Sequence, residues 1–290
     1  MGLQREFNQI TERITQALWG NMDIGRIIVG NSENIKNITY ESIRDTINST
    51  YTPENAVLVI IGDIDYIQVL ESVQNKFGKW EDVETRPYKE IVNSFPGIYI
   101  NNSNNGKTSA LSLGFRLQNN YYSKNIPIEI ISTILGNPGL DSRMVKKIRL
   151  EEGLVYSINS FIAKYTKKGT LAFTTITSNE NVEKVLSLML QEIKYAKENF
   201  FTNEEISKAK NILKTQAILK MNDLSKHLKF LGSSSIGDKI FSLENEIRMI
   251  KKCSNEMIMN TMNEIFVNEN IGLAAIGKFD SDKIVQLISI

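Results

Sequence analysis

Apolar side chains recur every three or four residues in some segments of the chain and alternate in others, which predicts a mixture of helices and strands. Helical spacing occurs over residues 6–18, 39–49, 66–77, 126–135 and 182–196. Strand-like runs occupy residues 56–63, 98–102, 109–117, 154–165 and 169–177. A capping box at Thr202 and Glu205 predicts a long helix to about residue 228, followed by a loop over 232–237. The chain then closes with a helix, a strand and a helix.

Residues 35–65 and 250–280 form an internal repeat. Aligned without a gap, they are identical at 12 of 31 positions. Both copies read as a helix, a Glu-Asn turn, a strand ending in Ile-Gly, and an Asp before another helix. Agreement over this length indicates two related structural units. The offset places the start of a full first unit about 120 residues before Met1, so we expect the first unit to be truncated.

We therefore expect an α+β protein with two similar domains, each a mainly antiparallel sheet packed with helices, the first truncated on its N-terminal side. Residues 1–78 would be the C-terminal portion of the truncated unit, and 79–94, polar and containing Pro87, a linker. Residues 95–290 would form the complete second domain. The first unit keeps one predicted strand, too little sheet for a stable layered domain. Either the second domain or another chain must cover its apolar faces.

Composition narrows the class of protein. The chain has 34 basic and 33 acidic residues and no basic stripe interleaved with aromatics, which argues against a nucleic-acid partner. Its longest apolar runs are strand-length, far short of a bilayer span. The N-terminus shows no hydrophobic signal segment, and the single cysteine, Cys253, cannot form an intramolecular disulfide. Together these features favour a cytoplasmic location with no membrane partner.

The stretch 136–160 carries the candidate chemistry. A Gly-rich turn leads into a short predicted helix that stops at Gly153, and a strand follows. Arg149 then ends the helix and Tyr156 opens the strand, close together across one tight turn. Two structural interpretations stay open beside a functional one. A cation in a last helical turn is favoured by the helix dipole alone, and Tyr156 could be an ordinary half-buried strand tyrosine.

Histidine is scarce. The chain has only His227, in a Lys-rich helical stretch where a solvated side chain is expected. An H-x-x-E-H zinc site needs two histidines one helical turn apart, so this chain cannot build one. Glu6 and Glu12 are the nearest candidates for a third ligand, and neither is assigned to a metal. We expect no metal residue in this chain.

Several spaced motifs resemble one family. Residues 139–143 read G-x-x-S-R, and Arg149 stands seven residues before Tyr156 in R-x-x-x-G-L-x-Y-S. This resembles the C-terminal domain of the insulinase, pitrilysin and mitochondrial processing peptidase family. Residues 20–65 resemble the end of that family's zinc-binding domain, with Met22 and Asp23 in place of its usual His-Pro, and 201–210 matches its second domain. The resemblance spans nearly the whole chain.

The resemblance implies a role for the pair. In this family the Arg and Tyr reach across to a zinc site and hold the substrate carbonyl as it becomes an oxyanion, which implies that role for Arg149 and Tyr156. Zinc would then lie in a partner chain or in a missing N-terminal region.

Three functions remain open. The chain could be a metal-free subunit that hydrolyses peptides only in a heterodimer with an HxxEH-bearing homologue. It could instead be the C-terminal part of a single-chain zinc protease, or a non-enzymatic structural or peptide-binding subunit. On each of these interpretations the chain alone is inactive as a peptidase.

Overall fold

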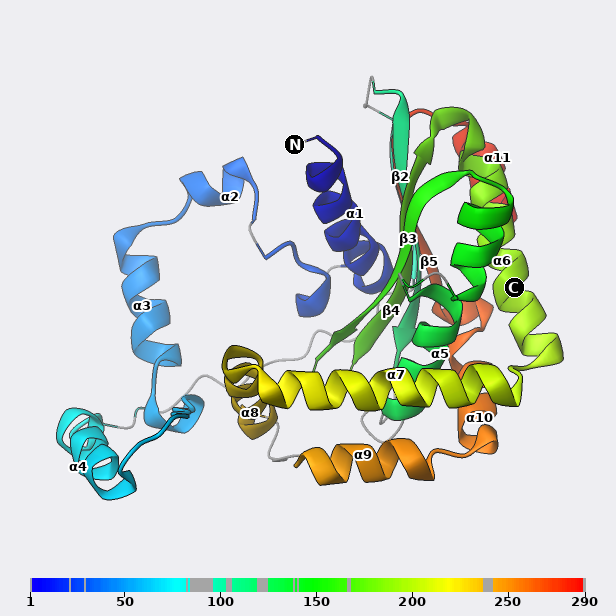
Figure 1. Cartoon of the computed structure of the whole chain (residues 1–290). Helices are drawn as coiled ribbons and strands as arrows, with labels where there is room; N and C mark the ends of the chain where they lie inside the picture. Colours follow the sequence, from blue (N-terminus) through cyan, green and yellow to red (C-terminus); the bar gives the residue numbers. More distant parts are fainter. Residues whose placement is uncertain are drawn as a thin grey trace. The chain divides into compact units, whose positions relative to one another are not determined.

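The computed structural model describes residues 2–20, 22–28, 30–81, 83, 96–102, 106–118, 125–137, 139, 141–165, 168–236 and 242–288, with the backbone only at 2–8 and 23. Contacts divide the chain into two compact units (Figure 1). Unit 1 comprises residues 1–28, 90–213 and 249–290, and unit 2 comprises residues 29–89 and 214–248. Each unit is described by itself below.

Unit 1 is built on a five-stranded sheet in the order β1-β5-β2-β4-β3. Its strands are β1 Ile98–Asn101, β2 Thr108–Leu117, β3 Val155–Lys164, β4 Gly169–Ser178 and β5 Ile271–Ile276. β1 runs parallel to β5, and the other pairs are antiparallel. In the middle of the sheet Leu113 lies opposite both Phe173 and Leu273. The predicted α+β class with a mainly antiparallel sheet is confirmed.

Helix α1, Gly2–Trp19, packs on one face of this sheet, where glycines allow a close approach (Figure 1). A Cβ at Gly114 would lie 2.6 Å from a side-chain carbon of Ile14, and one at Gly272 would lie 2.8 Å from Leu18. The guanidinium of Arg116 donates to the Leu18 carbonyl at the end of the helix. Burial lowers the pKa of Arg116 to about 10, so it remains a cation at neutral pH. α1 is therefore fixed to the sheet at its C-terminal end.

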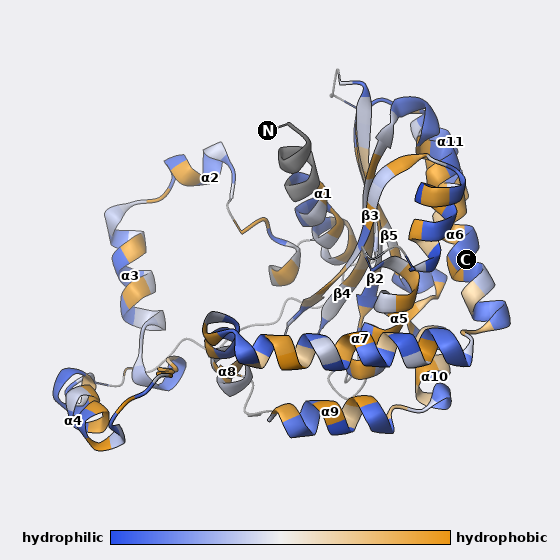
Figure 2. Cartoon of the chain, viewed as in Figure 1, coloured by the Kyte–Doolittle hydropathy of each residue, from blue (hydrophilic) through white to orange (hydrophobic). Residues whose placement is uncertain are grey.

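The opposite face carries the main hydrophobic core. It is covered by α5 Asn125–Gly136, α6 Val182–Asn199, α10 Asn255–Ile265 and α11 Ser281–Leu287. α5 and α6 occur where the hydrophobic spacing predicts them, and α10 and α11 are the two helices of the predicted closing helix, strand and helix. Figure 2 shows hydrophobic and hydrophilic residues alternating along α9, Leu243–Lys252, as expected of an amphipathic helix.

Unit 2 contains helices but no strand among its described residues. These are α2 Ser32–Lys36, α3 Tyr40–Thr50, α4 Tyr66–Phe77, α8 Leu224–Ile236 and the adjoining parts of α7 and α9. α3 and α4 begin as predicted, with the Thr39 hydroxyl accepting from the Ser42 amide and Asp65 capping α4. The strand predicted at residues 56–63 is not formed. A strand is stable only beside another strand, and the described part of unit 2 supplies none.

The predicted long helix is divided in two. α7, Asn203–Asn222, ends before Asp223, whose carboxylate accepts from the Lys226 amide and so caps α8. α8 then continues to Ile236, through the segment predicted to be a loop. The hydroxyls of Ser233 and Ser234 donate to carbonyls four residues earlier, the hydrogen bond that a serine commonly makes when it lies inside a helix.

The sequence-based domain boundary remains a prediction. Its linker, 79–94, lies mostly outside the described residues. The two compact units reflect contacts, which place α1 with the sheet of unit 1, whereas the prediction divides the chain by its internal repeat.

Candidate functional site

The predicted short helix before Gly153 is a π-helix, Val145–Glu151, and it carries Arg149. Its widened turn is closed by the Glu152 amide, which donates to the Lys147 carbonyl at 3.1 Å. Gly153 follows in the left-handed region with φ of 64°, and this confirms the predicted stop. π-Helical turns are rare in proteins, and many of those that occur lie at functional sites.

A β-bulge follows immediately on β3. Val155 lies opposite Thr177 and Ile158 opposite Thr175, so β3 has one residue more than β4 over this interval. The Thr177 hydroxyl donates to the Leu154 carbonyl at 2.7 Å, and the Thr175 hydroxyl donates to the Ser157 carbonyl at 2.6 Å. The bulge therefore has hydrogen-bond donors of its own, supplied by side chains of β4.

Arg149 and Tyr156 meet across the turn between these two irregularities. The guanidinium carbon of Arg149 lies 5.5 Å from the centre of the Tyr156 ring, a cation–π distance. Tyr156 is 86% exposed, so it is not the half-buried strand tyrosine that alternation alone would allow. Both predicted site residues are therefore brought together, with the tyrosine ring facing solvent.

Two ion pairs stabilise the turn between Arg149 and Tyr156. The Lys184 ammonium on α6 lies 2.7 Å from Glu152, and Lys147 lies 3.0 Å from Glu151. The hydrogen bond and charge of Lys184 lower the pKa of Glu152, which keeps that carboxylate ionised at neutral pH. The segment after Arg149 is thus tied to α6 by an ion pair.

A second ion pair, missed by the sequence reasoning, supports the start of the segment. Arg143 binds Glu205 in a two-pronged contact, with Nε 2.6 Å from Oε1 and Nη2 2.8 Å from Oε2. Glu205 also accepts from the Thr202 amide, while Thr202 accepts from the Glu205 amide, which confirms the capping box. Burial would raise the pKa of Glu205, but the bonds from Arg143 and Thr202 lower it overall. The sequence carried a signal for this ion pair: Arg143 ends the G-x-x-S-R motif, Glu205 belongs to the capping box, and the two side chains have opposite charges.

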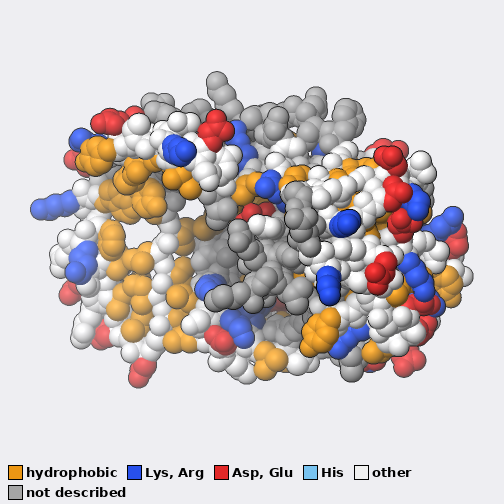
Figure 3. Space-filling view, turned by 90° about the horizontal axis from the view of Figure 1, so that it is seen from above, with side chains coloured by type: hydrophobic (Ala, Val, Ile, Leu, Met, Phe, Trp, Pro, Cys, Tyr) orange, Lys and Arg blue, Asp and Glu red, His pale blue; other side chains and the backbone are white. Residues whose placement is uncertain are grey.

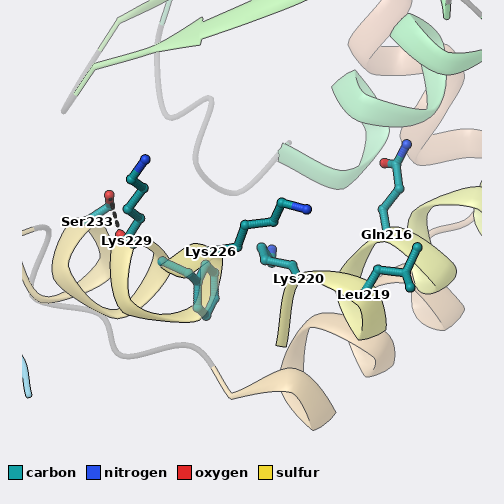
Figure 4. Close-up of a pocket in the computed structure, with 7 residues that line it drawn as sticks. Gln216, Leu219, Lys220, Lys226, Lys229 and Ser233 are labelled. Atoms are coloured by element: carbon teal, nitrogen blue, oxygen red, sulfur yellow. Dashed lines mark hydrogen bonds between the residues drawn. The ribbon is translucent and has the colours of Figure 1, made fainter. Parts of the chain in front are cut away.

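A hollow of about 550 Å³ lies in unit 2 (Figure 4). Lys226 extends from α8 toward the α7 side, where Lys220 lies. Lys220 is paired with Glu246 at 2.9 Å and stacks over the Phe230 ring, and Lys226 is paired with Asp223. Since much of the positive charge is already neutralised within the unit, we assign no ligand to this hollow.

The described residues do not fit a zinc site. Within them no three His, Cys, Asp or Glu side chains gather closely enough to hold a metal ion. His227 lies on α8 between lysines, and Cys253 is buried, which raises the pKa of its thiol. A thiol held protonated is a poor ligand for zinc.

No helix in the described part of the chain is both long and apolar enough to span a membrane.

Comparison with known proteins identifies the family. The profile described as Peptidase M16 inactive domain matches residues 37–213, more than half of the chain. The chain belongs to this family. The match includes both Arg149 and Tyr156, and the peptidase family predicted from the sequence is confirmed.

Relatives of the M16 chain include two with informative names. An uncharacterized zinc protease of Mycobacterium tuberculosis, Rv2782c, is 24% identical over 280 residues, covering 94% of this chain and 63% of the relative. The mitochondrial-processing peptidase subunit alpha-2 of Dictyostelium discoideum is 24% identical over 263 residues, covering 87% of this chain and 58% of the relative. The M16 chain thus spans about three-fifths of these relatives.

A solved structure shares the fold. The peptidase M16 inactive domain from Pseudomonas fluorescens superposes with a TM-score of 0.83 at 18% identity, covering 95% of this chain and 66% of that one. At this level of identity the likeness concerns the fold alone.

Proposed function

We propose that this M16 chain supplies the substrate-binding and oxyanion-stabilising half of a zinc peptidase, working with a homologous polypeptide that carries the H-x-x-E-H motif. The observation that carries the proposal is the exposed Tyr156 ring held beside Arg149 between a π-helix and a β-bulge. Two adjacent irregularities of this kind place a donor pair outward, where a bound peptide can reach it.

Both side chains donate hydrogen bonds. A phenol hydroxyl and a guanidinium can each donate to a peptide carbonyl oxygen, and the bond strengthens as that oxygen becomes negative. Tyr156 would donate to the developing oxyanion, and Arg149 would hold a substrate carbonyl. The zinc and the glutamate that activate water would belong to the partner, and no step at the metal falls to this chain.

Removal of one hydroxyl tests the proposal. One oxyanion donor contributes about 3 kcal/mol, so Tyr156→Phe should lower kcat roughly 100-fold with little change in KM. The assay combines this full chain with a homologous H-x-x-E-H polypeptide and follows cleavage of an unstructured peptide. The chain alone in excess zinc serves as the blank and should leave the peptide intact.

Tyr195→Phe is the matched control. Tyr195 is an exposed tyrosine of the same unit, and the substitution keeps the ring on which Arg143 stacks. It should leave kcat unchanged. Equal turnover by Tyr156→Phe and wild type would remove Tyr156 from the mechanism.

A second candidate is the C-terminal part of a single-chain zinc protease. It is favoured by the 63% coverage of the mycobacterial relative, which is named a zinc protease. The genomic sequence upstream of Met1 decides this cheaply, because an in-frame H-x-x-E-H would support one continuous polypeptide.

A third candidate is a non-enzymatic peptide-holding subunit. The matched family is described as an inactive domain, which favours it. A zinc-loaded complex that binds unfolded peptides tightly and never cleaves them would establish this alternative.

A further inference from the structure

Arg149 has no counter-ion among the described residues. Its side chain is half-buried, yet in that part of the chain its guanidinium contacts the Tyr156 ring and no carboxylate or other hydrogen-bond acceptor. A charge that is partly removed from water costs free energy unless it is paired. The site therefore holds a cation that a bound anion would stabilise.

Two carboxylates close to Arg149 in the sequence are held elsewhere. Glu152 follows Arg149 by three residues, the spacing at which opposite charges commonly pair on a helix. In the structure Glu152 lies instead 2.7 Å from Lys184 and 3.7 Å from Lys147. Glu151 lies 3.0 Å from Lys147. The two lysines thus neutralise the two glutamates and leave the charge of Arg149 uncompensated.

The second arginine of these motifs, Arg143, shows how the fold holds a guanidinium in a structural role. Its Nε and Nη2 bind both carboxylate oxygens of Glu205, and Nη2 also donates to the Phe200 carbonyl at 3.0 Å. Arg149 lies six residues later and makes no such bonds within the described part of the chain. Its donors are therefore left for a ligand.

These donors outnumber the needs of one carbonyl group. A guanidinium has five N–H donors, whereas a carbonyl oxygen accepts through two lone pairs. Arg149 can therefore hold the substrate carbonyl proposed above and still donate to a second acceptor. A carboxylate fits best, because its two oxygens match the guanidinium fork and its charge is opposite.

We propose that Arg149 also binds a carboxylate of the peptide, so that peptides acidic near the scissile bond are the preferred substrates. The carboxylate belongs to an acidic side chain or to a free C-terminus. The guanidinium carbon lies 5.5 Å from the centre of the Tyr156 ring. Since residues of an extended peptide are about 3.4 Å apart, the carboxylate would lie within about two residues of the carbonyl bound by Tyr156. This inference rests on the proposed function, because it assigns the peptide to the same pair.

The charge of the chain as a whole is balanced. It has 34 basic and 33 acidic residues. Figure 3 shows both signs intermingled over the face in view, with no single basic patch there. Without a large field of one sign, a preference for acidic peptides has to come from individual side chains. Removal of one charge is therefore a direct test.

The first experiment measures binding of labelled, unstructured, N-acetylated peptides to the full chain by fluorescence anisotropy. Three peptides differ only in their acidic groups: one has a central Glu and an amidated C-terminus, one a central Gln and an amidated C-terminus, and one a central Gln and a free C-terminus. We expect one or both acidic peptides to bind about 10- to 100-fold more tightly than the neutral one, as expected for a hydrogen-bonded charge pair. The difference should shrink at high salt.

Substitutions then locate the effect. Arg149→Gln should abolish the preference, and Arg149→Lys, which keeps the charge without the fork, should retain only part of it. Lys194→Gln is the matched control, because Lys194 is exposed on α6 of the same unit and the substitution removes the same charge. It should bind all three peptides as the wild type does. The comparison of peptides on the wild type holds even where a substitution destabilises the fold.

The second experiment adds the H-x-x-E-H polypeptide and measures kcat/KM for the same peptides. The acidic peptide that binds best should be cleaved about 10- to 100-fold more efficiently than the neutral one, and Arg149→Gln should equalise the two.

Equal binding of the three peptides, undetectable binding of all three, or a preference that survives Arg149→Gln overturns the proposal. Preferential binding of an acidic peptide without any cleavage supports it and counts against the proposed peptidase function. Cleavage that depends on Tyr156 but proceeds equally with all three peptides refutes this inference and leaves the proposed function standing.

Discussion

Replacement of Thr177 by valine tests whether β4 holds the bulge beneath Tyr156. The substitution keeps the size of the side chain and removes only the hydroxyl that donates to the Leu154 carbonyl at 2.7 Å. Thr177 is 3% exposed and Leu154 is half-buried, so the carbonyl left without this donor is partly shielded from water. An unsatisfied buried acceptor costs about 1–3 kcal/mol. In a unit of roughly 200 residues, each kcal/mol corresponds to about 2–4 °C in melting temperature.

We therefore expect Thr177→Val to lower the melting temperature by about 2–12 °C and to speed hydrogen exchange at residues 155–158. Thr174→Val is the matched control on the same strand, because it breaks the buried 2.7 Å contact with Ser112 and leaves the bulge intact. It should lower the melting temperature comparably without changing exchange at 155–158. The reasoning is refuted if Thr177→Val exchanges at the wild-type rate over these residues.

Two further predictions concern unit 1. Gly272→Val should destabilise it by about 1–3 kcal/mol, because a Cβ there would lie 2.8 Å from Leu18 and 3.1 Å from the Gly97 carbonyl. Urea unfolding measures this loss. Gly139→Val is the control and should change little, because a Cβ at Gly139 would make only an ordinary van der Waals contact, 3.5 Å from Asn137 Oδ1. Burial raises the pKa of the Glu192 carboxyl despite the nearby charges of Arg143 and Lys147. Ionisation of Glu192 therefore destabilises the folded state, and this loss of stability is complete once the pH exceeds the raised pKa. Glu192→Gln should therefore be more stable than wild type at pH 7, with the difference shrinking as the pH falls toward 4; a constant difference from pH 7 to pH 4 would contradict this assignment.

Hydrophobic spacing predicted the elements of unit 1 because most of them have one apolar face and are buried against each other. It failed at residues 56–63 for the opposite reason. The run AVLVII has the composition of an inner strand, but a strand also needs neighbours, which the described part of unit 2 does not contain. The failure therefore concerns the surroundings of the segment, whereas its local pattern matches the counterpart that forms β5.

The position of Tyr156 was hidden by a one-residue insertion. Strict alternation from Ile158 places Tyr156 on the buried face, but in the structure Val155 and Ile158 are both buried, three residues apart. The bulge supplies the extra residue and so reverses the direction of Tyr156. The threonines that hold the bulge lie on β4, about 20 residues later in the chain, so no local pattern could reveal it.

The same reasoning explains the π-helix. Met144, Val145 and Ile148 have the spacing of an apolar helical stripe, and that spacing does not separate an α-helix from a helix one residue wider per turn. What distinguishes them is the hydrogen bond from the Glu152 amide to the Lys147 carbonyl, next to the ion pair that ties Glu152 to Lys184 on α6. One extra residue thus precedes Gly153 and another follows it. Each changes the direction of a neighbouring side chain relative to the regular element, and Arg149 and Tyr156 face each other across the turn between them.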